Sequence, residues 1–254
     1  MVTKDNYTEE NSKAVDSWVK TGWIWSRPIT HGEYLNAKAG KYRILLTPTV
    51  PVPEEWIGPV KGKKVLALAS GGGQQGPVFQ ALGADVTVLD YSEAQLGKEK
   101  EVALREGYDI NLIRADMTRP LPFDDGEFDI VFNPVSTIFI EDVAPLWKEC
   151  ARIVKKGGVL MTGIDNGINY IVEGEDETRI THSLPYNPLK DSALMQELKE
   201  ADAGIQFSHS LTDNLQPLLK NGFMLTDIYE DTNGEGRLHE MNIPTFVAMR
   251  LVRV

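Results

Sequence analysis

The sequence is poor in cysteine, in long apolar runs and in positive charge, and each shortage excludes a class of protein. Its 254 residues include one cysteine, Cys150, so no disulfide can form within the chain. No apolar run approaches the roughly 20 residues that a membrane-spanning helix requires. The start of the chain is polar and acidic, and it lacks the basic and apolar regions of a signal peptide. We therefore expect a cytoplasmic protein that does not act in a membrane.

The charge balance argues against nucleic acid as a partner. The formal net charge is −11, whereas nucleic acids and anionic membranes attract basic surfaces. The segment 133–136 (NPVS) begins like a motif of nucleic-acid methylation, but it lacks the second proline and the aromatic residue that stacks on a flipped base. No cluster of metal ligands is evident. A small molecule is therefore the expected partner, and the sequence leaves the oligomeric state open.

The middle of the chain alternates strand-like and helix-like segments, which is typical of a parallel sheet covered by helices. Apolar and β-branched runs predict strands over 64–69, 85–90, 110–115, 128–132, 159–164, 223–229 and 245–253. Helices are predicted over 74–82, 92–106, 142–154 and 211–220. We expect one domain over 1–254, with a first cover (1–58), a core (59–166), an irregular and acidic second cover (167–208) and a closing helix with strands (209–254).

The most informative stretch is KKVLALASGGGQQG, residues 63–76, where a buried strand runs into a glycine-rich turn and a helix. Glycines allow the backbone to approach a ligand closely, and a helix N-terminus offers free N–H groups. About 20 residues further on, Asp90 ends the second predicted strand, where a carboxylate can accept hydrogen bonds from ribose hydroxyls. This order of elements predicts an adenosine-containing ligand at the strand ends.

The glycines within 71–76 also fit the dinucleotide pattern G-x-G-x-x-G, so an NAD-dependent oxidoreductase is an alternative. A short-chain dehydrogenase would need Tyr-x-x-x-Lys on a helix after the turn. Residues 34–38 fit that spacing but precede the turn, and residues 186–190 contain Pro188, which would interrupt a helix. The NAD alternative is therefore the weaker one.

Three later segments favour another adenosine ligand. They are RADM at 114–117, FDIVFN at 128–133 and IVKKGGVL at 153–160. With the glycine-rich turn, they make residues 60–166, and more loosely the remainder to 254, resemble the class I S-adenosylmethionine-dependent methyltransferases of the small-molecule "methyltransferase 11" type. The resemblance implies a Rossmann-like, doubly wound α/β fold: a seven-stranded, mostly parallel sheet with its last strand antiparallel and helices on both faces. It also implies S-adenosylmethionine as cofactor and methyl transfer to a small-molecule acceptor by direct in-line displacement.

The resemblance also assigns cofactor contacts. The glycine-rich turn would approach the methionine part of the cofactor, Asp90 would hold the ribose, and Tyr91 would lie against the adenine. Asp116 would meet the adenine amino group beside Met117, and Asn133 would line the methyl-transfer side. The complete predicted set is Ala69, Ser70, Gly71, Gly73, Gln75, Asp90, Tyr91, Ala115, Asp116, Met117 and Asn133.

The glycine-rich motif departs from the family pattern at two positions. Ala67 stands where the family usually has an acid that orients the cofactor's amino group, and Ala69 stands where it has a glycine. A protein that binds S-adenosylmethionine without catalysing transfer is therefore a second alternative.

The sequence shows no catalytic dyad, and it does not identify the acceptor atom. Among the histidines, His31 in the first cover is the best candidate for a base. Asp165 and Asn166, just after the fifth predicted strand, are candidates by their place in the fold. Both covers are expected to close over the acceptor. The aromatic residues expected to wall its pocket are Trp23, Trp25, Tyr34 and Tyr170.

Overall fold

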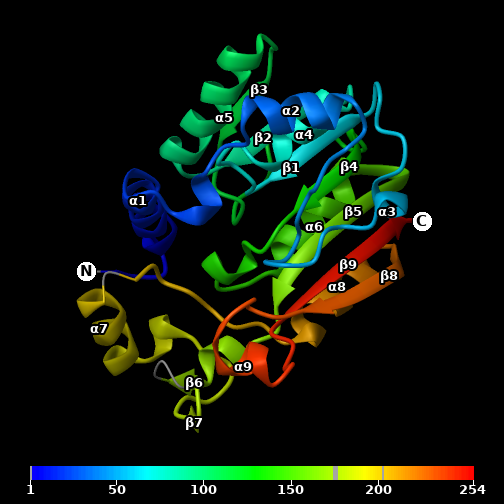
Figure 1. Cartoon of the computed structure of the whole chain (residues 1–254). Helices are drawn as coiled ribbons and strands as arrows, with labels where there is room; N and C mark the ends of the chain where they lie inside the picture. Colours follow the sequence, from blue (N-terminus) through cyan, green and yellow to red (C-terminus); the bar gives the residue numbers. More distant parts are fainter. Residues whose placement is uncertain (1, 174–176, 202) are drawn as a thin grey trace.

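Seven strands form one sheet in the computed structural model, which describes residues 2–173, 177–201 and 203–254 (Figure 1). The strand order is β3–β2–β1–β4–β5–β9–β8; neighbours among β1 to β5 pair in parallel, and β9 runs antiparallel to β5 and β8. The predicted fold class is confirmed. The strands are β1 (Lys64–Leu68), β2 (Asp85–Asp90), β3 (Asn111–Arg114), β4 (Phe128–Asn133), β5 (Val154–Asp165), β8 (Phe223–Asp231) and β9 (Phe246–Arg253).

The helices and a small hairpin complete the fold. The helices are α1 (Tyr7–Lys20), α2 (His31–Lys38), α3 (Glu54–Ile57), α4 (Gln75–Ala81), α5 (Glu93–Glu106), α6 (Ala144–Ile153), α7 (Ser192–Glu200), α8 (Leu211–Lys220) and α9 (Gly236–Glu240). The hairpin pairs β6 (Val172–Glu173) with β7 (Arg179–Ile180). No helix in the described ranges is long and apolar enough to cross a bilayer.

Both faces of the sheet are buried, which explains why its central strands are apolar throughout. Along β1, Leu66 and Leu68 belong to one buried cluster, together with Trp147 of α6. Val65 and Ala67 belong to the other, together with Phe79 of α4. Alternate side chains of a strand point to opposite faces, so α6 and α8 cover one face while α2, α4 and α5 cover the other.

Strand β5 begins earlier than the sequence predicts. Val154 pairs with Phe128 of β4, so strand pairing starts directly after α6. A register shift between Phe128 and Ile130 then absorbs the intervening residues, and regular pairing resumes at Val159. A bulge of this kind depends on the partner strand and leaves little trace in the local sequence.

The first cover crosses the carboxyl ends of the central strands. The backbone N–H of Val135, just after β4, donates to the Leu46 carbonyl at 3.2 Å. The same carbonyl lies so close to Gly163 of β5 that a Cβ atom there would collide with it. A glycine at this position therefore lets the cover lie directly against the sheet.

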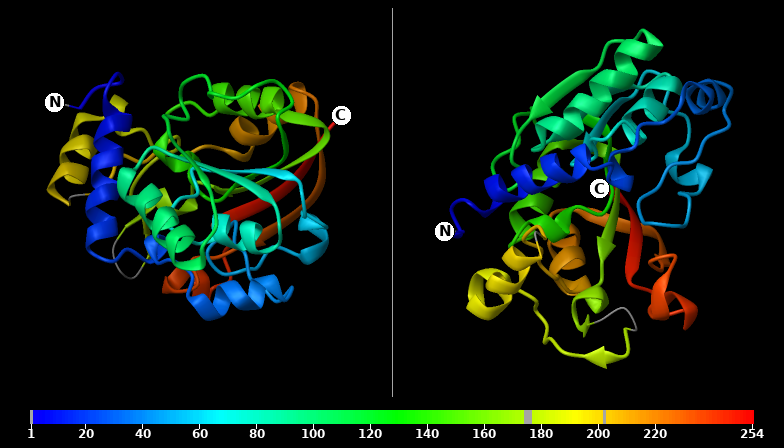
Figure 2. Two further views of the ribbon diagram at one scale, coloured as in Figure 1. Left: turned by 90° about the horizontal axis from the view of Figure 1, so that it is seen from above. Right: turned by 60° about the vertical axis from the view of Figure 1, so that its left-hand side comes forward.

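The second cover meets the first at the end of the molecule that carries α1. Helix α7 lies near the N-terminal end of α1 (Figure 2). Tyr7 of α1, Met195 of α7 and Phe207 form a buried cluster of their own. The sequence predicts an irregular second cover, but α7 lies within it, because its apolar side chains gain their burial from α1, which is far away in sequence.

Candidate functional site

A cavity of about 430 Å³ opens at the carboxyl ends of the parallel strands, within the usual range for small-molecule sites. Its floor comes from the turns after β1, β2, β3 and β4, and its cover from α1, the segment 45–48 and residues 165–170 and 206. In open α/β sheets ligands bind at this edge, where the strand order reverses. Here β1 lies between β2 and β4, so the reversal falls at the glycine-rich turn.

The glycine-rich turn after β1 has the backbone that the sequence predicts. Ala69 adopts a φ of +46°, a left-handed conformation that favours glycine. Gly72 has a φ of +100°, and a Cβ atom there would lie 2.5 Å from the Trp25 carbonyl. Ala69 therefore occupies a glycine-type position, and the turn has room for Trp25 only because Gly72 has no side chain.

Asp90, at the end of β2, is held against this turn. Its Oδ2 accepts the Gly71 N–H at 3.0 Å and its Oδ1 accepts the Ser92 N–H at 2.9 Å. Burial raises the pKa of Asp90 to about 6, although these N–H donors act in the opposite direction. The carboxylate lines the cavity and has further lone pairs free to accept hydroxyl donors from a ligand.

Asp116, after β3, is fixed from two sides. Its Oδ1 accepts the Thr118 N–H at 2.8 Å, and its Oδ2 accepts the Thr8 hydroxyl of α1 at 2.8 Å. Nearby, the Tyr91 hydroxyl donates to Glu9 of α1 at 3.1 Å. Helix α1 therefore touches two of the residues assigned to the adenine end of the ligand.

Three of the residues that line the cavity carry a buried polar atom without a partner in the described structure, and two of these atoms lie beside the glycine-rich turn. These two are the Ser70 hydroxyl oxygen and the Gln95 side-chain oxygen. Buried polar atoms normally have hydrogen-bond partners, so such atoms on a cavity wall are candidates for ligand contacts. With the Asp90 and Asp116 carboxylates, they form a donor and acceptor set that suits a nucleoside carrying an amino acid group.

Glu99 of α5 is a buried residue beneath the turn that the sequence analysis does not single out. It is fully buried, and its Oε1 accepts the Gly73 N–H at 2.7 Å, while Oε2 has no partner in the described structure. Burial raises the pKa of Glu99 to about 8. Its position in a charged helix resembles that of an ordinary surface glutamate, so only the tertiary structure identifies it.

Asp165, the last residue of β5, lies in the wall on the other side of the cavity. Its Oδ1 accepts the Gly167 N–H at 2.7 Å, and its Oδ2 accepts the Asn169 amide at 2.7 Å. Burial raises the pKa of Asp165 to about 6. The Tyr170 hydroxyl, in the same wall, donates to Gln206 at 2.8 Å.

Several residues from the sequence analysis share this one cavity. Those that line it are Trp23, Trp25, Ala69, Ser70, Gly71, Gln75, Asp90, Tyr91, Ala115, Asp116, Met117, Asp165 and Tyr170. They come from both covers and from the turns after β1, β2, β3 and β5, so the fold assembles them from distant parts of the chain.

Other predicted site residues lie outside the lining. Asn133 is fully buried, and its amide donates to the Leu68 carbonyl and the Ser136 hydroxyl, each at 2.8 Å. Gly73 faces Glu99 beneath the turn. The Asn166 amide donates to the Pro244 carbonyl at 2.9 Å. These residues hold neighbouring segments together.

The remaining two, His31 and Tyr34, belong to α2. His31 is exposed and pairs with Glu106 of α5 at 2.8 Å. The Tyr34 ring stacks on Tyr108 with a centroid distance of 5.6 Å. Neither lines the cavity, because the first cover turns away from the strand ends before it reaches α2.

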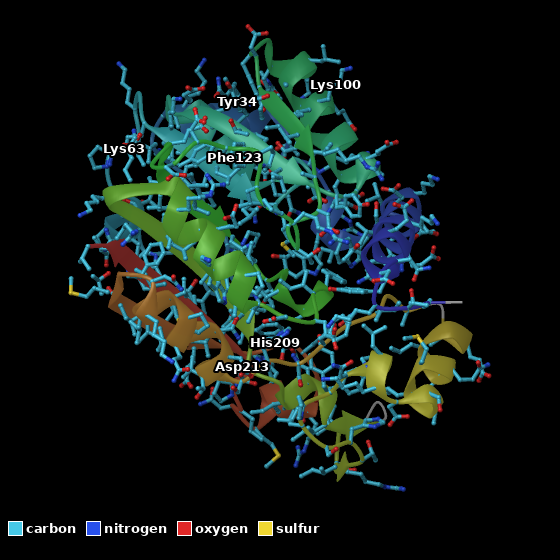
Figure 3. The ribbon with its side chains drawn as sticks, turned by 180° about the vertical axis from the view of Figure 1, so that it is seen from behind. Tyr34, Lys63, Lys100, Phe123, His209 and Asp213 are labelled. Atoms are coloured by element: carbon cyan, nitrogen blue, oxygen red, sulfur yellow. The ribbon has the colours of Figure 1, made fainter. Side chains whose placement is uncertain are left out.

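None of the described residues that line the cavity is a histidine or a cysteine. His209 lines a separate hollow of about 380 Å³, together with Asp213, which lies near it in Figure 3. Cys150 is buried in α6, and burial raises its pKa well above the ordinary range for a thiol. Among the described residues, no group of three or more His, Cys, Asp or Glu side chains is arranged to bind a metal ion.

Helix α1 is the part of the site that the sequence analysis misses. Thr8, Asn11, Ser12 and Val15 line the cavity from above. The Ser12 hydroxyl donates to the Tyr91 carbonyl at 2.8 Å, and Asp16 accepts the Ala94 N–H of α5 at 3.0 Å. The acidic, amphipathic pattern of this helix is a helix signal, but it does not reveal where the helix docks.

Comparisons of sequence agree with this geometry. A family model described as a methyltransferase domain matches residues 66–162. A Bacillus subtilis protein named uncharacterized methyltransferase YbaJ is 40% identical over 250 residues, which cover 96% of this chain and 97% of that protein. A demethylmenaquinone methyltransferase of Renibacterium salmoninarum is 33% identical over 105 residues, 41% of this chain and 42% of that protein.

Solved structures share the fold at lower identity. An S-adenosylmethionine-dependent methyltransferase from Mesorhizobium loti superposes with a TM-score of 0.62 at 22% identity, over 78% of this chain and 94% of that one. A geranyl diphosphate C-methyltransferase from Streptomyces coelicolor gives a TM-score of 0.54 at 20% identity, over 79% of each chain. The 40% identity over almost the whole chain shows that the protein belongs to the same methyltransferase family as YbaJ, and its fold is the one that S-adenosylmethionine-dependent methyltransferases share.

Proposed function

We propose that this enzyme binds S-adenosylmethionine across the turns after β1, β2 and β3 and transfers its methyl group to a small-molecule acceptor. The observation that carries the proposal is the placement of Asp90 and Asp116 on one cavity wall, on either side of Tyr91 along the sheet edge. Bound there, the cofactor would supply a methyl group on a positively charged sulfur.

Different residues of the cavity bind different parts of the cofactor. Asp90 accepts hydrogen bonds from the two ribose hydroxyls. Asp116 accepts a hydrogen bond from the adenine amino group, beside Met117 and Ala115. The Ser70 hydroxyl and the Gln95 side-chain oxygen, buried without partners, meet the amino acid end of the ligand together with Ala69, Gly71 and Gln75. Charge-assisted hydrogen bonds of this kind are about twice as strong as neutral ones.

The acceptor then enters from the side of β4, β5 and β9. We name this region the acceptor end of the cavity and define it by Phe139, Asp165, Tyr170, Gln206 and Phe246. Phe246 begins β9 and pairs with Asp165, so it lies at the same edge of the sheet. Closure by the two covers excludes water and aligns the acceptor lone pair with the methyl carbon for in-line displacement. Transfer would break the bond between the sulfur and the methyl carbon and form the bond to the acceptor, S-adenosylhomocysteine would leave, and the proton of an O–H or N–H acceptor would pass to Asp165, which accepts the hydrogen bond of that group.

Calorimetric titration of the purified protein with S-adenosylmethionine, S-adenosylhomocysteine and NADH tests the proposal. We expect binding of the first two and none of NADH. Loss of the charge-assisted bonds in Asp90→Ala should weaken binding of both by about 10- to 100-fold. The exposed Asp109, on the far side of α5, supplies the matched control Asp109→Ala, which should bind as the wild type does.

The outcomes separate the alternatives. Binding of NADH alone would overturn the methyltransferase proposal in favour of an oxidoreductase. Tight binding of S-adenosylmethionine without turnover on any acceptor of a broad panel would favour the non-catalytic alternative, which the alanines at positions 67 and 69 motivate.

A further inference from the structure

The cavity lining carries negative charge and no positive charge. Three aspartates line it, Asp90, Asp116 and Asp165, whereas none of the described lining residues is Lys, Arg or His. Lys100 of α5 is exposed at the periphery of the molecule (Figure 3), and Arg114 of β3 lies over the ring of Tyr91, 5.0 Å from its centroid, without joining the lining. An anion that entered the cavity would therefore find no cationic side chain to pair with.

Asp165 dominates the acceptor end. The residue is 6% exposed, and its side chain is the one carboxylate among the residues that define this end. Each of its oxygens accepts one hydrogen bond, from Gly167 and from Asn169. A carboxylate has about four acceptor sites, so capacity remains for a donor that comes from the cavity.

The other groups at this end offer little to an anion. The Tyr170 hydroxyl already donates its proton to Gln206. Phe139 and Phe246 provide apolar walls, and Ile138 and Val135 extend them. No cationic side chain of the described lining would compensate a buried anion, and the Asp165 carboxylate adds like-charge repulsion, so the neutral Gln206 amide is the donor that remains at this end.

We infer that the methyl acceptor is a compound with an apolar body and no negative charge, which presents an O–H or N–H group to Asp165; carboxylic acids and phosphate esters are excluded. The inference rests on the proposed function, since it concerns the same cavity once the cofactor site is filled. It names the chemical class of the acceptor, which the family alone does not.

Ligand-observed NMR on the protein saturated with S-adenosylhomocysteine tests the inference. The probes are fragment triplets, in which one aromatic or aliphatic body carries an alcohol, an amine or a carboxylic acid. We expect alcohols and amines to bind, and their carboxylic acid counterparts to bind at least about tenfold more weakly. Asp165→Asn should reduce this discrimination by about tenfold, because it removes the local charge and preserves the shape.

A matched control separates this local effect from the net charge of the protein. Asp109→Asn removes one negative charge from an exposed position and should leave the discrimination unchanged. Acids that bind as tightly as alcohols in the wild type would overturn the inference, and so would equal effects of the two variants. Absence of all fragment binding would overturn the assignment of the acceptor end as a ligand site.

The proposed function is tested separately in the same samples. If S-adenosylhomocysteine fails to bind, the proposed function is at fault. If it binds and acids are accepted, only the inference on the acceptor class fails.

Discussion

The Glu99 carboxyl group accepts the backbone N–H of Gly73 at 2.7 Å, although it is fully buried in a helix most of whose other charged residues are exposed. This bond ties α5 to the glycine-rich turn from below. A Cβ atom at Gly76 would lie 2.7 Å from Glu99 Oε2, so the turn and the helix start close around the carboxyl group. Glu99 is therefore a support of the turn that the cofactor is proposed to contact.

Glu99 makes stability depend on pH in a defined direction. Burial raises its pKa from the ordinary 4.5 to about 8, so the folded protein retains a proton that the unfolded chain releases. The contribution of Glu99 is complete below pH 4.5 and is lost as pH rises toward 8. Between these limits, Glu99→Gln should gain about 1.4 kcal/mol in unfolding free energy per pH unit relative to the wild type.

Chemical denaturation at several pH values between 5 and 8 measures this difference. The matched control is Glu101→Gln, two residues further along α5 and exposed, for which the curves of variant and wild type should run parallel. Parallel curves for Glu99→Gln would mean that Glu99 is ionised in the folded protein.

Asp90 should make cofactor affinity depend on pH. Its carboxylate must be ionised to accept ribose hydroxyls, and burial raises its pKa to about 6. The dissociation constant of S-adenosylhomocysteine should therefore rise by up to about tenfold for each pH unit below 6 and should level off above it. Calorimetry from pH 5 to 7 tests this, with Asp90→Asn expected to abolish the dependence. Because burial also raises the pKa of Asp165 to about 6, Asp165→Asn is the control, and this variant should keep the pH dependence of cofactor binding.

Ala69 stores backbone strain that glycine would relieve. At a φ of +46°, an alanine lowers the stability of the folded protein by about 1–2 kcal/mol. A glycine would remove this strain, but its greater freedom in the unfolded chain would cancel part of the gain. Ala69→Gly should therefore raise the unfolding free energy by about 0.5–1 kcal/mol. Ala14→Gly, inside α1, should lower it by about 1 kcal/mol. A loss of stability in Ala69→Gly comparable to that in Ala14→Gly would contradict the strained backbone.

Replacing Ala67 by the acid of the family pattern should destabilise the fold. Its side chain is fully buried in the cluster that contains Phe79 and Phe132, and it does not line the cavity. Ala67→Asp should lower the unfolding free energy by at least about 3 kcal/mol and should not tighten cofactor binding. The conservative Ala67→Ser should cost less than half as much. Tighter binding by a stable Ala67→Asp protein would show that the position faces the ligand.

The order of the core strands and helices, and the chemistry of the turn after β1, can be predicted from the amino-acid sequence. Apolar runs, a glycine-rich turn and Asp90 at a strand end are local patterns, and local backbone physics determines what they form. The approximate bounds of β1, β2, α5 and β9 therefore agree between sequence and structure. The fold class followed because parallel strands joined by helices allow few arrangements.

The tertiary structure alone decided where the covers lie and what they contribute. Helix α1 packs on α5, and its Thr8 donates a hydrogen bond to Asp116. His31 of α2 instead pairs with Glu106, outside the cavity. The lack of a cation among the described lining residues and the burial of Glu99 also arise from contacts between segments far apart in the chain. Such contacts depend on how whole faces pack together, and short-range sequence patterns carry no information about them.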